Sequence, residues 1–243
     1  MLKQALSPLV DLVYPPRCPT CGDAIGEHGA LCLPCWNALV IPGEPACTKC
    51  QRPFGNEEVA AGSVCAVCLA DPPGHAGISA ATLYNDASRK LVLAFKHGNR
   101  IALSRLLARM IIARLPELEG QWLVVLVPLH FRRQWQRGFN QSALLAQEIA
   151  RARGLDLLVD GLQRTRATPS LGGLGRKERA KVLSGAIIAN PKRLGPIEGA
   201  NVLLVDDVMT SGATTDAYLK ALRKAGAAHT RIACFARVLD EAL

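Results

Sequence analysis

A strand, a turn and a helix follow one another between Val202 and Lys224. Val202–Val205 is an unbroken apolar run, which is typical of a parallel strand buried on both faces. Two acids, Asp206 and Asp207, stand where that strand should end, and a turn and a helical pattern follow them. In open α/β sheets, ligands bind outside the carboxyl ends of the strands. We therefore predict an α/β fold, with a parallel sheet flanked by helices and a ligand site at the end of this strand.

The turn after the two acids has the chemistry of a phosphate site. Gly212 lets the backbone approach a ligand closely, and the N-terminus of the next helix offers N–H groups to an anion. Carboxylates accept hydrogen bonds from sugar hydroxyls and also suit a hydrated Mg²⁺. Together these groups indicate a ribose 5-phosphate site; the alternative is a capped helix with solvated acids. The hydroxyls of the turn belong to Thr210, Ser211, Thr214 and Thr215.

The same residues resemble the phosphoribosyl-pyrophosphate (PRPP) signature of type I phosphoribosyltransferases. The resemblance implies that Asp206 and Asp207 hold the ribose hydroxyls and take part in catalysis, with Mg²⁺ as the cofactor. It disfavours a 6-oxopurine acceptor, because relatives that use one carry an acid at the position of Thr210. The PRPP-binding residues that it implies are Asp206, Asp207, Val208, Met209, Thr210, Ser211, Gly212, Ala213, Thr214 and Thr215.

Eight of the nine cysteines form four Cys-x-x-Cys pairs. Two such pairs can hold one tetrahedral metal ion, so the eight predict two closed, structural zinc sites. Consecutive pairing is the simplest arrangement, and interleaved pairing stays open. A disulfide framework is the alternative, but it is typical of secreted domains, and Met1–Val13 is too polar for a signal-peptide core. The predicted ligands are Cys18, Cys21, Cys32, Cys35, Cys47, Cys50, Cys65 and Cys68.

A Pro- and Gly-rich stretch, Asp71–His75, divides the sequence. We predict a small Cys-rich double zinc ribbon with an N-terminal helix over residues 1–72, and a phosphoribosyltransferase-like domain over residues 76–243. The charge is also unevenly distributed. Residues 1–75 hold four Lys or Arg and seven Asp or Glu, a net charge of −3. Residues 76–243 therefore carry +12, which gives the whole chain its net charge of +9. A polyanionic partner should therefore meet the second part of the chain.

Apolar periodicity and caps predict the remaining elements. We expect His28 and His75 to be surface residues and Cys234 to be a buried core thiol. The expected strands cover residues 77–84, 122–127, 186–189 and 231–238, and the expected helices cover 85–98, 101–115, 140–153 and 213–224.

A cationic loop follows the apolar strand over residues 122–127. Arg132, Arg133 and Arg137 lie in it, and no acid occurs between Glu119 and Glu148. At the carboxyl end of a strand in the same sheet, such a loop could receive a second phosphate group. The alternative is a solvated charged loop.

The order of these motifs resembles the ComF/GntX-like family, which joins a double zinc ribbon to a phosphoribosyltransferase domain. The resemblance covers nearly the whole chain. It adds Lys96, in Ala-Phe-Lys-His-Gly, to the PRPP site and implies that Arg132, Arg133 and Arg137 are catalytic, stabilising the leaving pyrophosphate. The residues that match the family loop are Pro128, Arg132, Arg133, Arg137, Gly138, Phe139, Asn140 and Gln141.

Three functional hypotheses follow from this resemblance. The first is a PRPP- and Mg²⁺-binding protein, with phosphoribosyl transfer, linked to natural competence and DNA uptake. The second is a non-catalytic protein that binds single-stranded DNA, since Phe131, Trp135 and Phe139 alternate with arginines in the loop; an accessory role in metabolism or metal-cluster handling is a third reading. Relatives carry Gln and Asn where this chain has Leu171 and Val182, which speaks against catalysis.

The sequence also gives expectations for the partners and the location of the protein. The ligand is PRPP or a nucleotide, and the resemblance adds single-stranded DNA and a DNA-uptake helicase. No apolar run reaches the roughly 18 residues that span a membrane. We expect a cytoplasmic protein without a membrane span.

Overall fold

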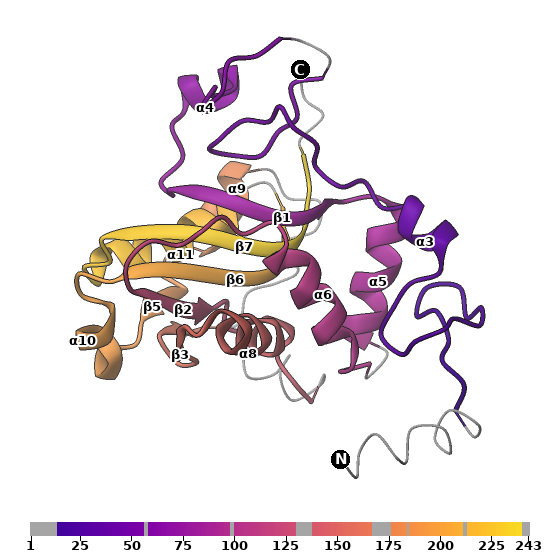
Figure 1. Ribbon diagram of the computed structural model, residues 1–243. Helices are drawn as coiled ribbons and strands as arrows, with labels where there is room; N and C mark the ends of the chain where they lie inside the picture. Colours follow the sequence, from indigo (N-terminus) through magenta and orange to yellow (C-terminus); the bar gives the residue numbers. More distant parts are fainter. Residues whose placement is uncertain are drawn as a thin grey trace.

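The centre of the protein is a five-stranded sheet in the order β1-β7-β6-β2-β3 (Figure 1). The computed structural model describes residues 14–55, 58–97, 100–129, 138–166, 176–183, 185–210 and 213–239. All neighbouring strands of the sheet run parallel, so the predicted α/β class is confirmed. The strands are β1 (Gly77–Leu83), β2 (Trp122–Leu126), β3 (Asp156–Leu158), β6 (Asn201–Met209) and β7 (His229–Arg237).

Strand β6 is covered on both faces, which explains its unbroken apolar run. Leu203 and Val205 pack into one core with α5, α6 and α8, whereas Val202 and Leu204 pack into another with α11. Figure 1 shows the first three helices on one side of the sheet and α11 behind it. The helices are α5 (Asp86–His97), α6 (Leu103–Ile112), α8 (Gln141–Arg153) and α11 (Ala213–Lys224), close to the predicted bounds.

Polar side chains cap two of these helices, as predicted. Asn85 Oδ1 accepts a hydrogen bond from the Ser88 backbone N–H at 2.9 Å, and the Asn85 N–H donates to Ser88 Oγ at 2.8 Å. This reciprocal pair starts α5. Asn140 starts α8 by accepting from the Ser142 N–H at 3.0 Å. Both caps lie at the carboxyl edge of the sheet, where they orient the helices that face the acid pair.

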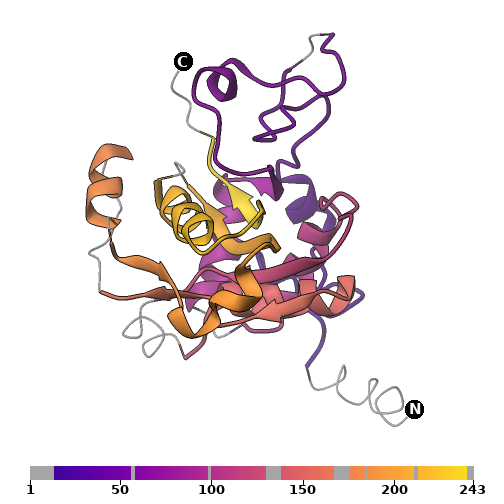
Figure 2. The ribbon, with the colours of Figure 1, turned by 90° about the vertical axis from the view of Figure 1, so that its left-hand side faces the viewer.

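A smaller layer lies against α11. Strands β4 (Leu162–Arg164) and β5 (Ile187–Ala189) form an antiparallel pair, and α9 (Arg176–Leu183) and β5 both contact α11 (Figure 2). A 3-10 turn, η1 (Pro191–Arg193), and α10 (Leu194–Ile197) lead from β5 toward β6. The strand at β5 was predicted, but β3 and β4 were not, because three residues are too few to show a period.

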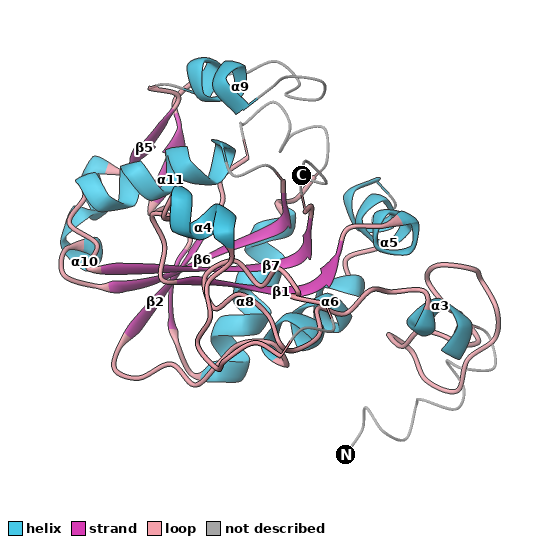
Figure 3. Cartoon of the chain, turned by 90° about the horizontal axis from the view of Figure 1, so that it is seen from above, coloured by secondary structure: helices cyan, strands magenta, loops and turns pink. Residues whose placement is uncertain are grey.

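The cysteine-rich segment packs against the sheet domain in two places. Its first half, with α3 (Leu33–Asn37), lies beside α5 and α6, where Arg100 Nη1 donates to the Pro19 carbonyl at 2.7 Å. Its second half, with α4 (Ala66–Ala70), covers the β1 and β7 face that α11 leaves open. Figure 3 shows α3 next to α5 and, well apart from it, α4 above the sheet.

The same segment also closes the outer edge of β1. The Leu83 N–H and Thr82 Oγ1 both donate to the Val40 carbonyl, at 2.7 and 2.8 Å. Farther along the strand, the Ala80 N–H donates to Gln51 Oε1 at 2.7 Å. An exposed strand edge invites pairing with another chain, and these contacts occupy it.

Some predictions fall on residues that the structure does not describe. The helix expected within Met1–Val13 lies outside the described residues. Among the residues that are described, no helix has the length and apolar character needed to cross a membrane.

Candidate functional site at the end of β6

Two helices converge on the two acids at the carboxyl end of β6. Lys96 Nζ, from α5, forms an ion pair with Asp207 Oδ2 at 2.6 Å. Ser142 Oγ, from α8, donates to Asp206 Oδ1 at 3.0 Å. Two backbone N–H groups also donate to the carboxylates. The Asp207 N–H donates to Asp206 Oδ1 and the Val208 N–H donates to Asp207 Oδ1, each at 2.8 Å. The acid pair is therefore held in place before any ligand arrives.

The two carboxyl groups differ in their surroundings. Burial and the neighbouring charge of Asp207 raise the pKa of Asp206 to about 7, against the smaller opposing effects of Lys96 and its hydrogen bonds. Asp207 is 8% exposed and has the lysine as its counter-charge. Near neutral pH the pair can thus hold both a proton and a negative charge, which suits hydrogen bonding to hydroxyl groups.

The predicted phosphate turn lies directly beyond this pair. Val208 packs against the core beside α5, and Met209 is buried against the second half of the cysteine-rich segment. Thr210 is exposed, and Thr214 and Thr215 are half-buried in the first turn of α11. Of Ala213 only the backbone is described. The predicted residues Ser211, Gly212, Arg132, Arg133 and Arg137 lie outside the described residues.

The structure thus joins three of the predicted residues and adds one. Lys96, Asp206 and Asp207 lie in direct contact, although Lys96 is more than 100 positions away in the sequence. Ser142 was not predicted. Its only signal in the sequence was its place two residues after the cap Asn140, and a serine in a first helical turn is too common to indicate a site.

The eight paired cysteines form two clusters from consecutive pairs. One cluster holds Cys18, Cys21, Cys32 and Cys35, and the other holds Cys47, Cys50, Cys65 and Cys68. Within each cluster, the sulfur atoms all lie within 4.8 Å of one another. The consecutive arrangement is therefore confirmed, and the interleaved one is wrong.

Both clusters fit zinc. Four sulfurs around a tetrahedral Zn²⁺, with Zn–S bonds of about 2.3 Å, are separated by about 3.8 Å. The Cys21–Cys32 and Cys50–Cys65 sulfurs are 3.5 and 3.6 Å apart. All four cysteines of the second cluster are buried, but only Cys18 of the first is. The second cluster is thus part of the protein core, and the first is a surface module.

The prediction that His75 lies at the surface is wrong. It was expected at the surface, yet it is 9% exposed, and burial lowers its pKa to about 4, with smaller contributions from Arg237, Lys49 and Arg231. It belongs to neither cysteine cluster. It is buried because the second half of the cysteine-rich segment folds over the sheet, which local sequence does not reveal. The expectation for Cys234 is confirmed: burial raises its pKa to about 12.

The buried imidazole predicts a difference in pH dependence. A folded pKa of about 4 lies below the unfolded value of about 6.5, so stability is retained above pH 6.5 and is lost as pH falls toward 4. Between pH 7 and 5 we expect the natural protein to lose about 2 kcal/mol more stability than the His75→Asn variant. Urea unfolding at both pH values measures this. The exposed His229 gives the control His229→Asn, which should behave like the natural protein; equal pH dependence in all three would contradict the prediction.

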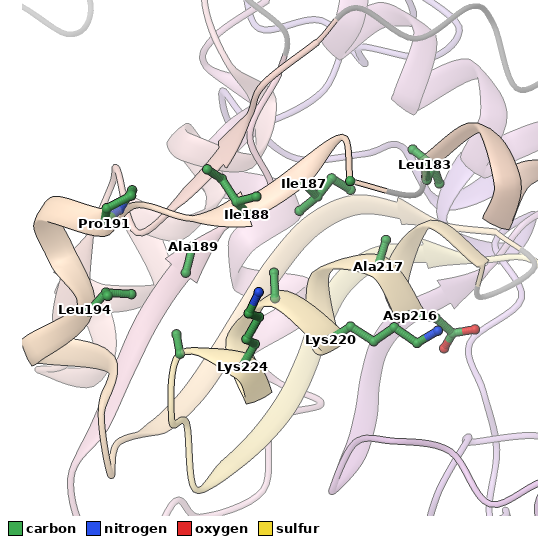
Figure 4. Close-up of a pocket in the computed structure, with 13 residues that line it drawn as sticks. Leu183, Ile187, Ile188, Ala189, Pro191, Leu194, Asp216, Ala217, Lys220 and Lys224 are labelled. Carbon is green, nitrogen blue, oxygen red and sulfur yellow. The ribbon is translucent and has the colours of Figure 1, made fainter.

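A separate hollow lies on the outer flank of α11. Its volume is about 560 Å³, and its lining is mostly apolar. Figure 4 shows Leu183, Ile187 and Ala189 on one side, facing Lys220 and Lys224 of α11 on the other. The acids Asp206 and Asp207 do not line it, so it is distinct from the site at the end of β6.

Two family models match the chain. A double zinc ribbon domain matches residues 9–71, and a phosphoribosyl transferase domain matches residues 141–242. The first covers the segment of both cysteine clusters, and the second covers α8, β6 and α11. Lys96 lies outside both matches.

Curated relatives match over most of their length. The "DNA utilization protein YhgH" of Salmonella typhi is 30% identical over 236 residues, covering 94% of this chain and all of the relative. The "Competence protein F" of Haemophilus influenzae is 30% identical over 222 residues, covering 85% and 96%. The "Competence protein ComFC" of Streptococcus pneumoniae is 28% identical over 204 residues, covering 83% and 84%.

Proposed function

Because this chain belongs to the ComF/YhgH family, with its double zinc ribbon and phosphoribosyltransferase domain, we propose that the carboxyl end of β6 binds PRPP together with Mg²⁺. We place this activity in the handling of DNA, as the names of the relatives indicate for them. The observation that carries the proposal is the acid pair, held by Lys96 and Ser142, directly before a hydroxyl-rich helix start.

Each part of the site has a role in this proposal. Asp206 and Asp207 accept hydrogen bonds from the ribose 2′- and 3′-hydroxyls and are the groups that suit a hydrated Mg²⁺. Thr214, Thr215 and the N–H groups at the start of α11 bind the 5′-phosphate. A bound Mg²⁺ supplies positive charge to the pyrophosphate of PRPP. Lys96 fixes Asp207 through their ion pair, which keeps the carboxylate oriented toward the ligand.

Phosphoribosyl transfer is the finer part of the proposal. Such a transfer needs charge stabilisation and positioning more than a dedicated base, and the fixed acid pair supplies positioning. The candidate catalytic residues are Asp206 and Asp207 and, from the cationic loop, Arg132, Arg133 and Arg137. A binding protein that retains the pocket without turnover is the second candidate, favoured by Leu171 and Val182, which depart from the Gln and Asn that the family resemblance implies at these positions.

Calorimetric titration of the zinc-loaded protein with PRPP and Mg²⁺ tests the binding. We expect the Asp206→Asn, Asp207→Asn double variant to lose measurable binding, because each side chain exchanges a carboxyl oxygen for an amide N–H₂ group that cannot accept from a ribose hydroxyl, while the side-chain size is kept. The Asp156→Asn variant, changed at an exposed acid on β3, is the matched control and should bind as the natural protein does. Undiminished binding in the double variant would refute the proposed site. PRPP-dependent pyrophosphate release, measured on the same variants, separates transfer from binding alone.

A further inference from the structure

Helix α5 carries Lys96 near its end and lies at the margin of the sheet domain. Within the described chain, α6 and α8 pack closely against each other and against the sheet, whereas α5 has no comparably close packing with any helix or strand. It reaches the core through side chains on one face, namely Leu91, Val92 and Phe95. Figure 1 shows α5 outside α6, with α3 on its far side. The position of α5 therefore depends on what holds its start.

Residues 38–40, which we call the α3 tail, hold the start of α5. Asn85 Nδ2 donates to the Ala38 carbonyl at 2.8 Å, while Asn85 Oδ1 caps the helix. The Val40 carbonyl accepts from two donors at the end of β1. Between these two contacts, Leu39 is 6% exposed and packs in the same core as α5. The α3 tail thus fixes the connection from β1 to α5 at three successive residues.

The α3 tail in turn depends on the first cysteine cluster. Helix α3 has only five residues, none of them buried, and no side chain caps it. A helix this short is not stable by itself. Two ligands of the cluster hold it, because Cys32 is the residue before its first turn and Cys35 lies within it. The N–H groups of Ala38 and Leu39 donate to carbonyls of α3 at 3.1 and 3.0 Å. Bound zinc therefore holds α3, and α3 holds its tail.

At the other end of α5, the ion pair between Lys96 Nζ and Asp207 Oδ2 tolerates little movement. Its length is 2.6 Å, and the two side chains are 21% and 11% exposed. The helix rises about 16 Å between Asn85 and Lys96, so a tilt of about 5° moves the lysine by more than about 1 Å. A displacement of that size away from Asp207 breaks a hydrogen bond of this length. A small change at the start of α5 therefore reaches the acid pair.

We propose that the first zinc site positions Lys96 against Asp207, acting through the α3 tail and α5. Asn85 is then a positioning residue for the acid pair, although it lies at the opposite end of α5. The proposal concerns the site before a ligand arrives, and its effect on PRPP rests on the function proposed above. It gives the first cluster, whose Cys21 is exposed, a task in regulation that the buried second cluster does not have.

The Asn85→Asp variant tests this path with little change in size. Its carboxylate still caps α5 by accepting from the Ser88 N–H, but it cannot donate to the Ala38 carbonyl. We expect PRPP with Mg²⁺ to bind about fivefold more weakly in calorimetric titration, since the acid pair loses a fixed hydrogen bond.

Arg109→Gln is the matched control. Arg109 Nη2 donates to the Gly29 carbonyl of the same zinc-binding half at 3.0 Å, but it does so from α6, which carries no residue of the candidate site. Both changes lower the net charge by one. The Arg109→Gln variant should bind PRPP as the natural protein does, and an equal loss in both variants would overturn the proposal.

A double variant separates positioning from a general loss of structure. In Lys96→Met the ion pair is already absent, so the addition of Asn85→Asp should leave the PRPP affinity of Lys96→Met unchanged. A further fivefold loss in that background, about the size expected for one hydrogen bond, would show that Asn85 acts by another route and would contradict the proposal.

Nitrogen NMR of the zinc-loaded full chain without PRPP gives a readout that does not depend on the proposed function. The ammonium signal of Lys96, identified by its loss in Lys96→Met, should move in Asn85→Asp and stay in place in Arg109→Gln. It should also move in Cys21→Ser, which removes a ligand of the first cluster. An unmoved signal in either of the first two tests of the path, Asn85→Asp or Cys21→Ser, would refute the positioning role. A signal that moves in a protein that binds no PRPP would refute the proposed function alone.

Discussion

Replacing Cys68 with serine is expected to lower the free energy of unfolding of the sheet domain by roughly 5 kcal/mol. The second cysteine cluster packs in one apolar core with Ile78, Ile232 and Met209, three side chains of the sheet. Without zinc, the segment over this core should unfold and expose them, at about 1.5–3 kcal/mol for each side chain. Urea unfolding followed by circular dichroism, with the zinc content of each sample, measures the loss.

The matched control is Cys21→Ser in the first cluster. Cys21 is exposed, and its half of the segment contacts α5 and α6 through hydrogen bonds such as that from Arg109 to the Gly29 carbonyl at 3.0 Å. One zinc ion should be lost here too, but the sheet domain should lose only about 2 kcal/mol, because Leu39 is the buried side chain by which this half enters the core. Equal destabilisation by the two substitutions would show that the clusters do not differ in their contribution to the core.

Replacing Lys96 with methionine is expected to cost about 3 kcal/mol of stability. The side chains of Lys96 and Asp207 are 21% and 11% exposed, so removal of the lysine leaves a nearly buried carboxylate without its counter-charge. Methionine keeps the length and the apolar stem of the lysine. The free energy of unfolding near pH 7 measures the effect, and PRPP titration of the same variant should show a loss of affinity, since Asp207 loses its fixed orientation.

A double variant separates the charge effect from packing. In Lys96→Met with Asp207→Asn, neither a lone carboxylate nor a lone ammonium remains, so most of the lost stability should return while PRPP binding stays weak. Stability that stays low in the double variant would assign the loss to packing of the lysine stem instead. The surroundings of His75 are unchanged in both variants, whereas the pKa of Asp206 responds to the charges of Lys96 and Asp207, so the variants are compared at more than one pH.

Much of the fold could be predicted because its signals are local. The apolar run before Asp206 reflects a strand buried on both faces, and Asn85 and Asn140 mark helix starts through bonds that span two or three residues. Strands β3 and β4 could not be predicted in the same way. They are held by pairing with β2 and β5, and three residues carry no periodic pattern of their own.

In the candidate site, too, the residues that are neighbours in the sequence could be predicted, and those that only the fold brings together could not. The acids at the end of β6 stood out in the sequence because strand, acids and turn are consecutive. The partners of these acids did not: Ser142 lies 64 positions from Asp206, and only the position of α8 beside β6 joins them. Lys96 entered the prediction by family resemblance, and the structure supplies its physical partner, Asp207.

By itself, the sequence determined the parallel α/β domain, the four Cys-x-x-Cys pairs and the place of the acid pair, since each depends on the spacing of neighbouring residues. The tertiary structure decided how the cysteines pair, that the second cluster becomes part of the core while the first stays at the surface, and that His75 is buried. It also decided that the Ala38 and Val40 carbonyls lie against the connection from β1 to α5. These features depend on how surfaces distant in the sequence fit together, and the free energy of that fit comes from contacts that no single segment contains.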